Sequence, residues 1–303
     1  MNTLYSDLLK LSETRYFMKN DVSLDGVNYR IFNYRIYSLK HFELPNALNA
    51  RGTMFEMTNE PKLVSLTMKK FFNLRELKEV PTGIMYASEK KDGSLISTYI
   101  HKDGLKLKTK NAISSPLVDN ATRALEPELH DLLMRMIRKY NCTIDMEFTS
   151  PGNKIVLHYP ETKLTILSAR YHETGEYIDR NVVIGDFPEL VNYIVNEYVV
   201  DETFLSKVPE MTEIEGFVMR FEDLRFKVKT KEYLELHKIN DKLNKKDIFK
   251  LFLENKLDDY RNPHNEPMIK DFEENFIPKY VDIIDRTEKF YNENKDLSKE
   301  NMP

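Results

Sequence analysis

The stretch "YASEKKDGSLISTYIH", residues 86–101, contains the turn around which the fold is organised. It reads as two strands, because apolar and polar residues alternate on both sides of a Lys-Lys-Asp-Gly turn at residues 90–93. A second turn signal, "KDG" at residues 102–104, leads into the strand-like run "LKLKTK" at residues 105–110. The sequence therefore predicts consecutive antiparallel strands around the turn that carries Lys90.

The run at residues 105–110 places Lys106, Lys108 and Lys110 on one strand face and two leucines on the other. A solvated face of an edge strand is the usual explanation for such alternating lysines. We therefore expect this lysine face to be exposed.

The rest of the chain combines further strand patterns with helices. Strand patterns occur at residues 28–38, 51–57, 62–74, 143–150, 154–159, 164–171, 213–221 and 224–230. A helix is predicted at residues 127–140, where Pro127 fits the first turn and one apolar stripe runs along the segment. After about Tyr233 the strand patterns stop and helical ones follow. These patterns predict an α+β fold, with a β-rich domain at residues 1–234 and a helical lobe at residues 235–303.

Composition excludes several classes of protein. The chain has 303 residues, a net charge of −4 and a single cysteine, Cys142, so neither a disulfide framework nor a cysteine-based zinc site is possible. No G-x-x-x-x-G-K-[ST] sequence is present, which excludes a P-loop. No apolar run approaches the roughly 20 residues of a membrane span. We expect a protein of the reducing cytoplasm that does not bind membranes.

Lys90 is a candidate nucleophile. A lysine attacks only as the neutral amine, and a free lysine has a pKa of about 10.4. Partial burial and neighbouring cations lower the pKa of a lysine. A nucleophilic Lys90 should therefore lie in a cleft with other lysines and with carboxylates that orient it. Alternation along the strand sends Lys91 to the opposite side.

The chain offers such partners further along. Glu147 lies in the apolar run "TIDMEF", Glu215 precedes Gly216 in "EIEGFVMR", and Lys227 and Lys229 alternate in "RFKVKTK". Taken singly, a charged residue in an amphipathic strand usually lies on its solvated face. Taken in order, K-x-D-G, a strand glutamate, E-G and K-x-K resemble the covalent nucleotidyltransferase superfamily, which includes polynucleotide ligases and mRNA capping enzymes.

One branch of that superfamily is more similar still. "RIFNYR", "LPNALNARGTMFEM", "MKKFFNL", "EKKDGSLISTY", "MEFTSPGNKIVLHY", "ETGEYI", "IEGFVMRF" and "FKVKTKEYLELH" resemble the type 1 RNA ligases of T-even bacteriophages. The resemblance spans roughly residues 4 to 240. It implies a nucleotidyltransferase domain with an ATP-grasp-like ligase fold, built of antiparallel sheets flanked by helices, at residues 1–234. It also implies a small all-helical C-terminal domain at residues 235–303, shorter than in the family.

The resemblance also assigns roles to residues. It implies that Lys90 is adenylated and that Glu215 assists the lysine and the catalytic metal. The residues implied to bind ATP are Tyr34, Arg51, Lys70, Glu89, Asp92, Gly93, Lys110, Glu147, Lys227 and Lys229. The pair Asp258-Asp259 resembles a metal-binding pair of that region, although adjacent acids at a helix end are more often solvated caps.

The activity implied is ATP-dependent joining of RNA 5′-phosphate and 3′-hydroxyl ends, with Mg²⁺ or Mn²⁺, by a monomer that repairs tRNA during phage infection in the host cytoplasm. A DNA ligase and a capping-type nucleotidyltransferase are the nearest alternatives. A non-catalytic RNA-binding protein of the same fold is a further one, and it predicts a broken lysine motif, whereas "EKKDGS" is intact.

Overall fold

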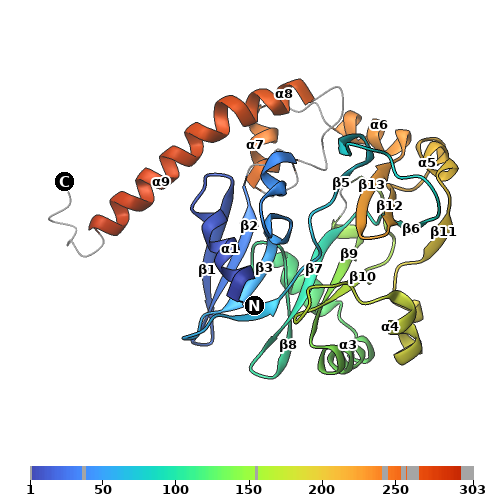
Figure 1. Ribbon diagram of the computed structural model, residues 1–303, viewed down its shortest axis with the longest axis horizontal. Helices are drawn as coiled ribbons and strands as arrows, with labels where there is room; N and C mark the ends of the chain where they lie inside the picture. The colour runs from blue at the N-terminus through green and yellow to red at the C-terminus, as the bar shows by residue number, and fades with distance from the viewer. Residues whose placement is uncertain are drawn as a thin grey trace. The chain divides into compact units, whose positions relative to one another are not determined.

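The computed structural model describes residues 2–35, 39–153, 156–240, 245–253, 257 and 266–294. The chain divides into two compact units, Met1–Asn240 and Asp241–Pro303, which are described separately below. The first unit contains three sheets and the second only helices among its described residues (Figure 1). The predicted α+β class is therefore confirmed.

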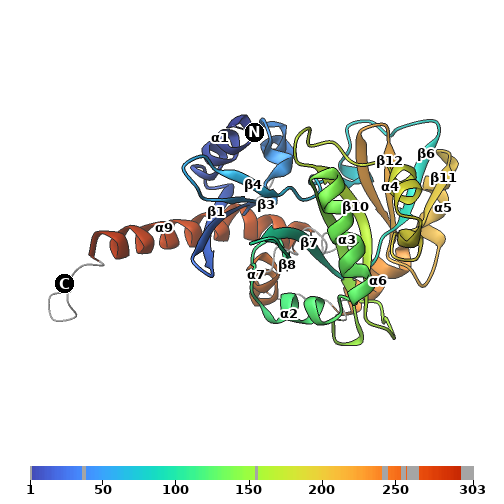
Figure 2. The ribbon, with the colours of Figure 1, turned by 90° about the horizontal axis from the view of Figure 1, so that it is seen from below.

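The middle sheet of the first unit contains the strand that follows Lys90. Its four strands pair antiparallel in the order β10-β9-β7-β8. The bounds are Ser94–His101 for β7, Gly104–Lys108 for β8, Cys142–Thr149 for β9 and Lys163–Tyr171 for β10. The predicted helix is α3, Pro127–Tyr140, and it lies against one face of this sheet (Figure 2). Its Leu133 and Met136 pack with Ile144 and Met146 of β9, so Asp145 and Glu147 face the other way.

A second, five-stranded sheet has the order β11-β6-β12-β13-β5, in which only the β13–β5 pair is parallel. The bounds are Phe72–Asn73 for β5, Met85–Glu89 for β6, Glu197–Val200 for β11, Gly216–Phe221 for β12 and Leu224–Lys229 for β13. One face packs Met85, Met219 and Phe226 against Leu205 of α5, Thr203–Lys207. Strand alternation leaves Lys227 and Lys229 on the opposite face.

The N-terminal sheet is antiparallel with the order β1-β2-β3-β4. The bounds are Phe17–Leu24 for β1, Val27–Tyr34 for β2, Arg51–Glu56 for β3 and Lys62–Ser65 for β4. Helix α1, Asn2–Ser12, buries Leu8 and Leu11 against Phe32 and Phe55 of this sheet. The strand pattern at residues 28–38 predicted β2, whereas β1 was not predicted.

Several elements had no clear sequence signal. They are β11, α2 (Pro116–Arg123) and α4 (Arg180–Asp186). The single strand expected at residues 62–74 is two short strands, β4 and β5. The backbone between them leaves the N-terminal sheet, which contains β4, and joins the five-stranded sheet, which contains β5.

Two sequence-based expectations are wrong. Val156 and Leu157, expected in a strand at residues 154–159, are not in one, because their backbone N–H groups donate to the side chain of Asp92. Lys108, expected on a solvated face, is fully buried and donates to the carbonyl oxygen of Gly52 at 2.6 Å. Burial lowers the pKa of Lys108 to about 7. The strand end is covered by the N-terminal sheet, which alternation alone does not reveal.

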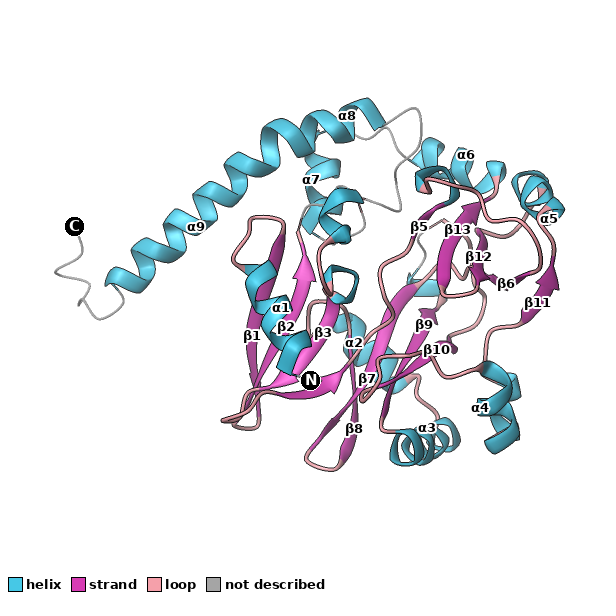
Figure 3. Ribbon diagram, in the orientation of Figure 1, coloured by secondary structure: helices cyan, strands magenta, loops and turns pink. Residues whose placement is uncertain are grey.

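The C-terminal part of the described chain is helical, as predicted (Figure 3). The helices are α6 (Lys231–Asn240), α7 (Lys245–Leu253), α8 (Glu266–Asp271), a π-helical turn (Phe272–Phe276) and α9 (Ile277–Asn294). In the second unit an aromatic cluster forms the core, with the Phe249 and Tyr280 ring centroids 4.9 Å apart. Helix α6 belongs to the first unit and spans the expected boundary near residue 234. None of the described helices combines the length and apolar composition that crossing a membrane requires.

Candidate active site

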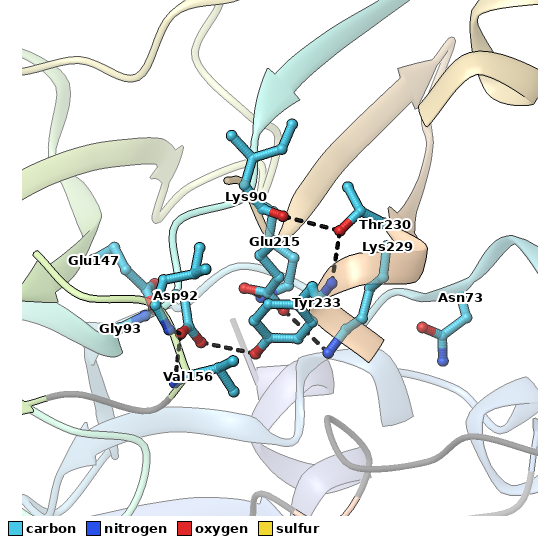
Figure 4. A network of polar contacts seen from close by, with 12 residues as sticks. Asn73, Lys90, Asp92, Gly93, Glu147, Val156, Glu215, Lys229, Thr230 and Tyr233 are labelled. Atoms are coloured by element: carbon cyan, nitrogen blue, oxygen red, sulfur yellow. Dashed lines mark hydrogen bonds and ion pairs between the residues drawn. The ribbon is translucent and has the colours of Figure 1, made fainter. Parts of the chain in front are cut away.

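Lys90 follows β6 and contacts a buried carboxylate. Its Nζ lies 2.8 Å from Oε2 of Glu215, and Glu215 is only 1% exposed. Nζ of Lys229 lies 3.0 Å from the other carboxylate oxygen, Oε1 (Figure 4). Glu215 thus links the candidate nucleophile to a lysine of β13. Removing one member of such a buried group leaves its partner charges uncompensated, which is strongly destabilising.

Gly216 holds Glu215 in this place. Its φ is +146°, and a Cβ atom there would lie 2.0 Å from the carbonyl oxygen of Val228. Its own carbonyl accepts a hydrogen bond from the backbone N–H of Lys90 at 2.9 Å. The E-G pair therefore needs its glycine because β12 and β13 approach too closely for any side chain.

Asp92 fixes the turn after Lys90. Its Oδ2 accepts hydrogen bonds from the backbone N–H groups of Val156 and Leu157, both at 2.8 Å. Its Oδ1 accepts one from the hydroxyl of Tyr233, also at 2.8 Å (Figure 4). Asp92 is 2% exposed, so in this structure its carboxylate is engaged by protein groups and positions the loop that carries Lys90.

Gly93 brings Glu147 to the same turn. Its N–H donates to Oε1 of Glu147 at 3.2 Å. A Cβ at residue 93 would lie 2.4 Å from the carbonyl oxygen of Phe148. The glycine of K-x-D-G is therefore required by close packing of the turn against β9.

Lys91 and Lys90 have different partners. Nζ of Lys91 lies 2.7 Å from Oε1 of Glu89, which was expected to bind ATP. Both lysines follow the end of β6 at Glu89, so the expectation that they point to different sides stays a prediction.

A second group of candidate residues gathers around Tyr34. Nζ of Lys70 lies 5.2 Å and Nζ of Lys110 5.9 Å from the centroid of the Tyr34 ring. These distances are those of cation–π contacts. Lys70 is 5% exposed, so the structure brings together three residues from distant parts of the sequence around one buried ring.

Arg51 lies beside this second group. Gly52, with φ +99°, approaches the backbone of Lys110 so closely that a Cβ would be 2.9 Å from its Cα. Nη1 of Arg51 is buried and has no hydrogen-bond partner within the described part of the chain. A buried, unsatisfied guanidinium donor is costly, and a phosphate or carboxylate ligand would satisfy it.

The pairing of β5 with β13 joins the two groups. It places Asn73 opposite Lys227, which is 4% exposed on β13. Nζ of Lys70 also lies 5.7 Å from the ring of Phe72 in β5. The residues around Lys90 and those around Tyr34 thus meet along one edge of the second sheet.

Two tyrosines of this site, the buried Tyr233 and the half-buried Tyr159, were not predicted from the sequence. Tyr233 holds Asp92, and its ring centroid lies 4.8 Å from Nζ of Lys229. Tyr159 accepts a hydrogen bond from the N–H of Asp92 at 3.0 Å, and burial raises the pKa of Tyr159 to about 12. Tyr233 lies four residues after Lys229. Its proximity to the site could be predicted only if the start of α6, directly after β13, were known.

Asp145 was also missed, although it precedes Glu147 by two residues and shares its strand face. It is fully buried, lies 2.5 Å from the hydroxyl of Ser97 and accepts a hydrogen bond from the N–H of Met68 at 2.7 Å. Burial raises the pKa of Asp145. Its contacts fasten the segment before Lys70 onto β9.

A metal centre formed by protein side chains alone is not found among the described residues, which contain no group of three or more His, Cys, Asp or Glu side chains able to hold an ion. Asp258 and Asp259, expected as metal ligands, lie outside the described residues.

Comparison with solved structures identifies the fold. Two structures of an archaeal ATP-dependent RNA ligase, forms 1 and 2, match with TM-scores of 0.54 and 0.55 at 14% and 15% identity; each match covers 94% of this chain and 78% of the archaeal one. An Aquifex aeolicus protein assigned as an ATP-dependent DNA ligase matches with a TM-score of 0.51 at 15% identity, covering 95% of this chain and 80% of that one. At these identities the likeness establishes the shared ligase nucleotidyltransferase fold.

Comparison with protein families is more specific. The family model described as RNA ligase matches residues 49–234, more than half of the chain and the part that carries every candidate site residue except Tyr34, Asp258 and Asp259. This protein therefore belongs to the RNA ligase family.

Proposed function

We propose that this protein is an ATP-dependent RNA ligase that joins 5′-phosphate and 3′-hydroxyl ends through a lysyl–AMP intermediate on Lys90. The observation that carries the proposal is the buried Glu215 carboxylate held between Lys90 and Lys229. In a chain of the RNA ligase family, this arrangement supplies a nucleophile, a proton acceptor and an anion-binding cation within one contact network.

In the first step the Lys90 amine attacks the α-phosphorus of ATP. The new P–N bond replaces the bond between the α-phosphorus and the bridging oxygen, and pyrophosphate leaves. Lys90 loses one proton before attack, for which Glu215 at 2.8 Å is the acceptor, and a second as the phosphoramidate forms.

Charge builds up on the phosphorus and on the leaving pyrophosphate during this step. Preplaced cations stabilise such charge without having to reorganise. The candidates for this role are Lys227 and Lys229 on β13, together with Lys70, Lys110 and Arg51, which lie around Tyr34. The unsatisfied Nη1 of Arg51 supports its assignment to a phosphate.

The AMP then passes to RNA. An oxygen of the RNA 5′-phosphate attacks the AMP phosphorus, the P–N bond breaks and the Lys90 amine regains its proton. The 3′-hydroxyl of the second end attacks the activated 5′-phosphate, loses its proton, releases AMP and forms the phosphodiester. The covalent intermediate divides one difficult condensation into easier displacements.

A divalent cation fits this site only as a partly hydrated ion. Mg²⁺ keeps several waters and takes one or two carboxylates together with substrate phosphates. Glu215 and Glu147, which contact the Lys90 turn, would hold it. When bound, Mg²⁺ or Mn²⁺ would neutralise phosphate charge in the transferring group.

Intact-mass spectrometry after mixing the protein with ATP and Mg²⁺ tests the first step. We expect an AMP adduct in the wild type and in Lys91→Ala, and none in Lys90→Ala. Lys91 is the matched control because it is the neighbouring lysine with a separate partner, Glu89. An adduct that persists without Lys90 contradicts the proposal.

Substrate choice separates the related alternatives. We expect ATP rather than GTP to load Lys90, and 5′-phosphorylated single-stranded RNA rather than nicked DNA to be joined. Loading by GTP alone would indicate a capping-type enzyme, and sealing of nicked DNA alone a DNA ligase. Absence of any adduct in the wild type would favour a non-catalytic RNA-binding protein.

The biological setting that the resemblance suggests is repair of cleaved tRNA during phage infection. Comparing the joining of tRNA halves with that of unstructured oligonucleotides of equal length tests it, and equal rates would contradict a tRNA preference.

A further inference from the structure

A cationic cluster that the proposed chemistry does not use surrounds Tyr177. We name Lys69, Arg170, Tyr177 and Arg225 the Tyr177 cluster. Cζ of Arg225 lies 3.8 Å and Cζ of Arg170 5.2 Å from the centroid of the Tyr177 ring. The Tyr177 hydroxyl accepts a hydrogen bond from the backbone N–H of Lys69 at 2.9 Å. One ring therefore holds together segments from three distant parts of the chain.

The three cations of this cluster have no carboxylate ion pair within the described part of the chain. Arg170 donates to the carbonyl oxygens of Gly175 and Thr67 and to the amide oxygen of Asn49. The guanidinium of Arg225 stacks on Tyr177 and makes no hydrogen bond to any described residue. Its guanidinium donors are thus available to a ligand.

The cations also act on one another. Burial lowers the pKa of Arg225, and Arg220 lowers it further. Burial lowers the pKa of Lys69, and Arg170 and Arg225 add to that effect while Asp223 opposes it. These directions show positive charges that lie close together and are incompletely compensated.

The buried carboxylate of Asp145, which acts on both Arg170 and Arg225, does not balance this charge. Asp145 is hydrogen-bonded to Ser97 and Met68, and its field acts on four cations: Arg51, Lys108, Arg170 and Arg225. Excess positive charge that is partly shielded from water attracts an anion.

The cluster continues the cationic face of β13. Arg225, Lys227 and Lys229 alternate along this strand, so all three lie on the same face. At about 3.3 Å per residue, Arg225 lies about 7 Å along the strand from Lys227 and about 13 Å from Lys229. Arg220 lies directly opposite Arg225 on β12. Its Cζ lies 4.1 Å from the centroid of the Tyr86 ring, and its Nη2 forms an ion pair with Glu197.

We propose that the Tyr177 cluster binds a backbone phosphate of the RNA strand whose end is joined at Lys90. The inference rests on the proposed ligase function, which assigns the ATP phosphates to the lysines nearer Lys90. Arg225 supplies a guanidinium fork for phosphate oxygens, and Tyr177 holds that fork in place. Such contacts position a strand without reading its bases.

Binding of a labelled, 5′-phosphorylated single-stranded RNA, measured by fluorescence anisotropy over a range of salt concentrations, tests the proposal. We expect Arg225→Gln to weaken binding about tenfold or more, as loss of a charge-assisted hydrogen bond does. The slope of log affinity against log salt should fall by about 0.7, the value for one phosphate contact on a single strand. Arg135→Gln, on the exposed surface of α3, is the matched control and should leave both quantities unchanged.

Unchanged RNA affinity and salt slope in Arg225→Gln would overturn the proposal. A parallel loss of the AMP adduct formed from ATP would assign the cluster to the nucleotide and would overturn it as well. If Arg225→Gln does not fold, the same binding measurement on Lys69→Gln tests the proposal, because Lys69 is exposed and its substitution should not disturb the fold. RNA binding does not require catalysis. A wild-type protein that forms no AMP adduct but binds RNA in a way that depends on Arg225 would therefore contradict the ligase function and still support this binding site.

Discussion

Glu215 is the residue that connects the candidate nucleophile, Lys90, with Lys229, a candidate phosphate-binding lysine. Its two oxygens contact Lys90 and Lys229, and it is almost completely buried. In the proposed first step this side chain would accept a proton from Lys90 and hold Lys229 toward the same reacting atom. Its contribution is therefore expected in the first chemical step.

Glu215→Gln should slow formation of the AMP adduct about 100-fold or more, which is the contribution typical of general acid–base groups. The amide keeps the size of the side chain but loses the charge and the basic oxygen. The adduct is followed by intact-mass spectrometry over time. Glu189→Gln, on the surface beside Arg135, is the control, and a normal rate in Glu215→Gln would contradict the role.

Gly93 tests the packing of the turn. In Gly93→Ala the added Cβ would lie 2.4 Å from the carbonyl oxygen of Phe148, so the loop must shift. We expect a loss of about 1–3 kcal/mol in unfolding free energy, as for other overpacked sites, together with loss of the AMP adduct. Gly152→Ala, where no atom lies within 4 Å of the added Cβ, should change neither denaturant unfolding nor adduct formation. Equal behaviour of the two variants would show that the turn tolerates a side chain.

At the scale of elements, the site depends on segments that cross between sheets. The chain leaving β4 runs along the middle sheet to β5, and side chains of β9 fasten it. The N–H of Leu66 donates to Thr143 and that of Met68 to Asp145. These bonds set where Lys70 and β5 meet β13.

His172, after β10, supports the same crossing and should make stability depend on pH. Its Nε2 lies 2.8 Å from Oγ1 of Thr143, and burial lowers the pKa of His172 to about 4. The unfolded chain, with a histidine pKa of about 6.5, binds this proton first as the pH falls. Stability contributed by the neutral ring is therefore present above pH 6.5 and is lost between about pH 6.5 and pH 4, by about 3 kcal/mol at most.

Urea unfolding at pH 7 and pH 5 measures this effect. We expect His172→Gln to lose less unfolding free energy between the two pH values than the wild type, because carboxylates titrate equally in both proteins. Equal losses would show that His172 is not held neutral in the native state.

At the scale of the whole molecule, the candidate residues that the structure describes all belong to the unit Met1–Asn240. The functional division into a nucleotidyltransferase domain at residues 1–234 and a helical domain at residues 235–303 stays a prediction. Helix α6 crosses that boundary, and its Tyr233 holds Asp92.

A fragment of residues 1–240 should therefore unfold cooperatively and form the AMP adduct, since it retains α6 and Tyr233. Circular dichroism during heating and intact-mass spectrometry measure the two properties. A fragment ending at residue 230, which lacks the Tyr233 bond to Asp92, is the comparison and should lose the adduct. Adduct formation by both fragments would show that α6 is dispensable for the first step.

The sequence by itself determined which residues share a strand face and where most of the strands and the helix α3 lie. Alternation placed Lys227 with Lys229, and the apolar stripe of residues 127–140 predicted α3 to its ends. The same alternation, extended two residues before Lys227, predicts that Arg225 shares the strand face of Lys227 and Lys229. These properties are local, because they follow from the periods of a strand and a helix.

Only the tertiary structure decided what covers each face and which distant groups meet. It buried Lys108 under the N-terminal sheet, turned Asp92 toward Tyr233, and gathered Lys69, Arg170 and Arg225 around Tyr177. The physical reason is that the burial and charge balance of a side chain depend on packing between elements far apart in sequence, and periodicity within one element carries no information about that packing.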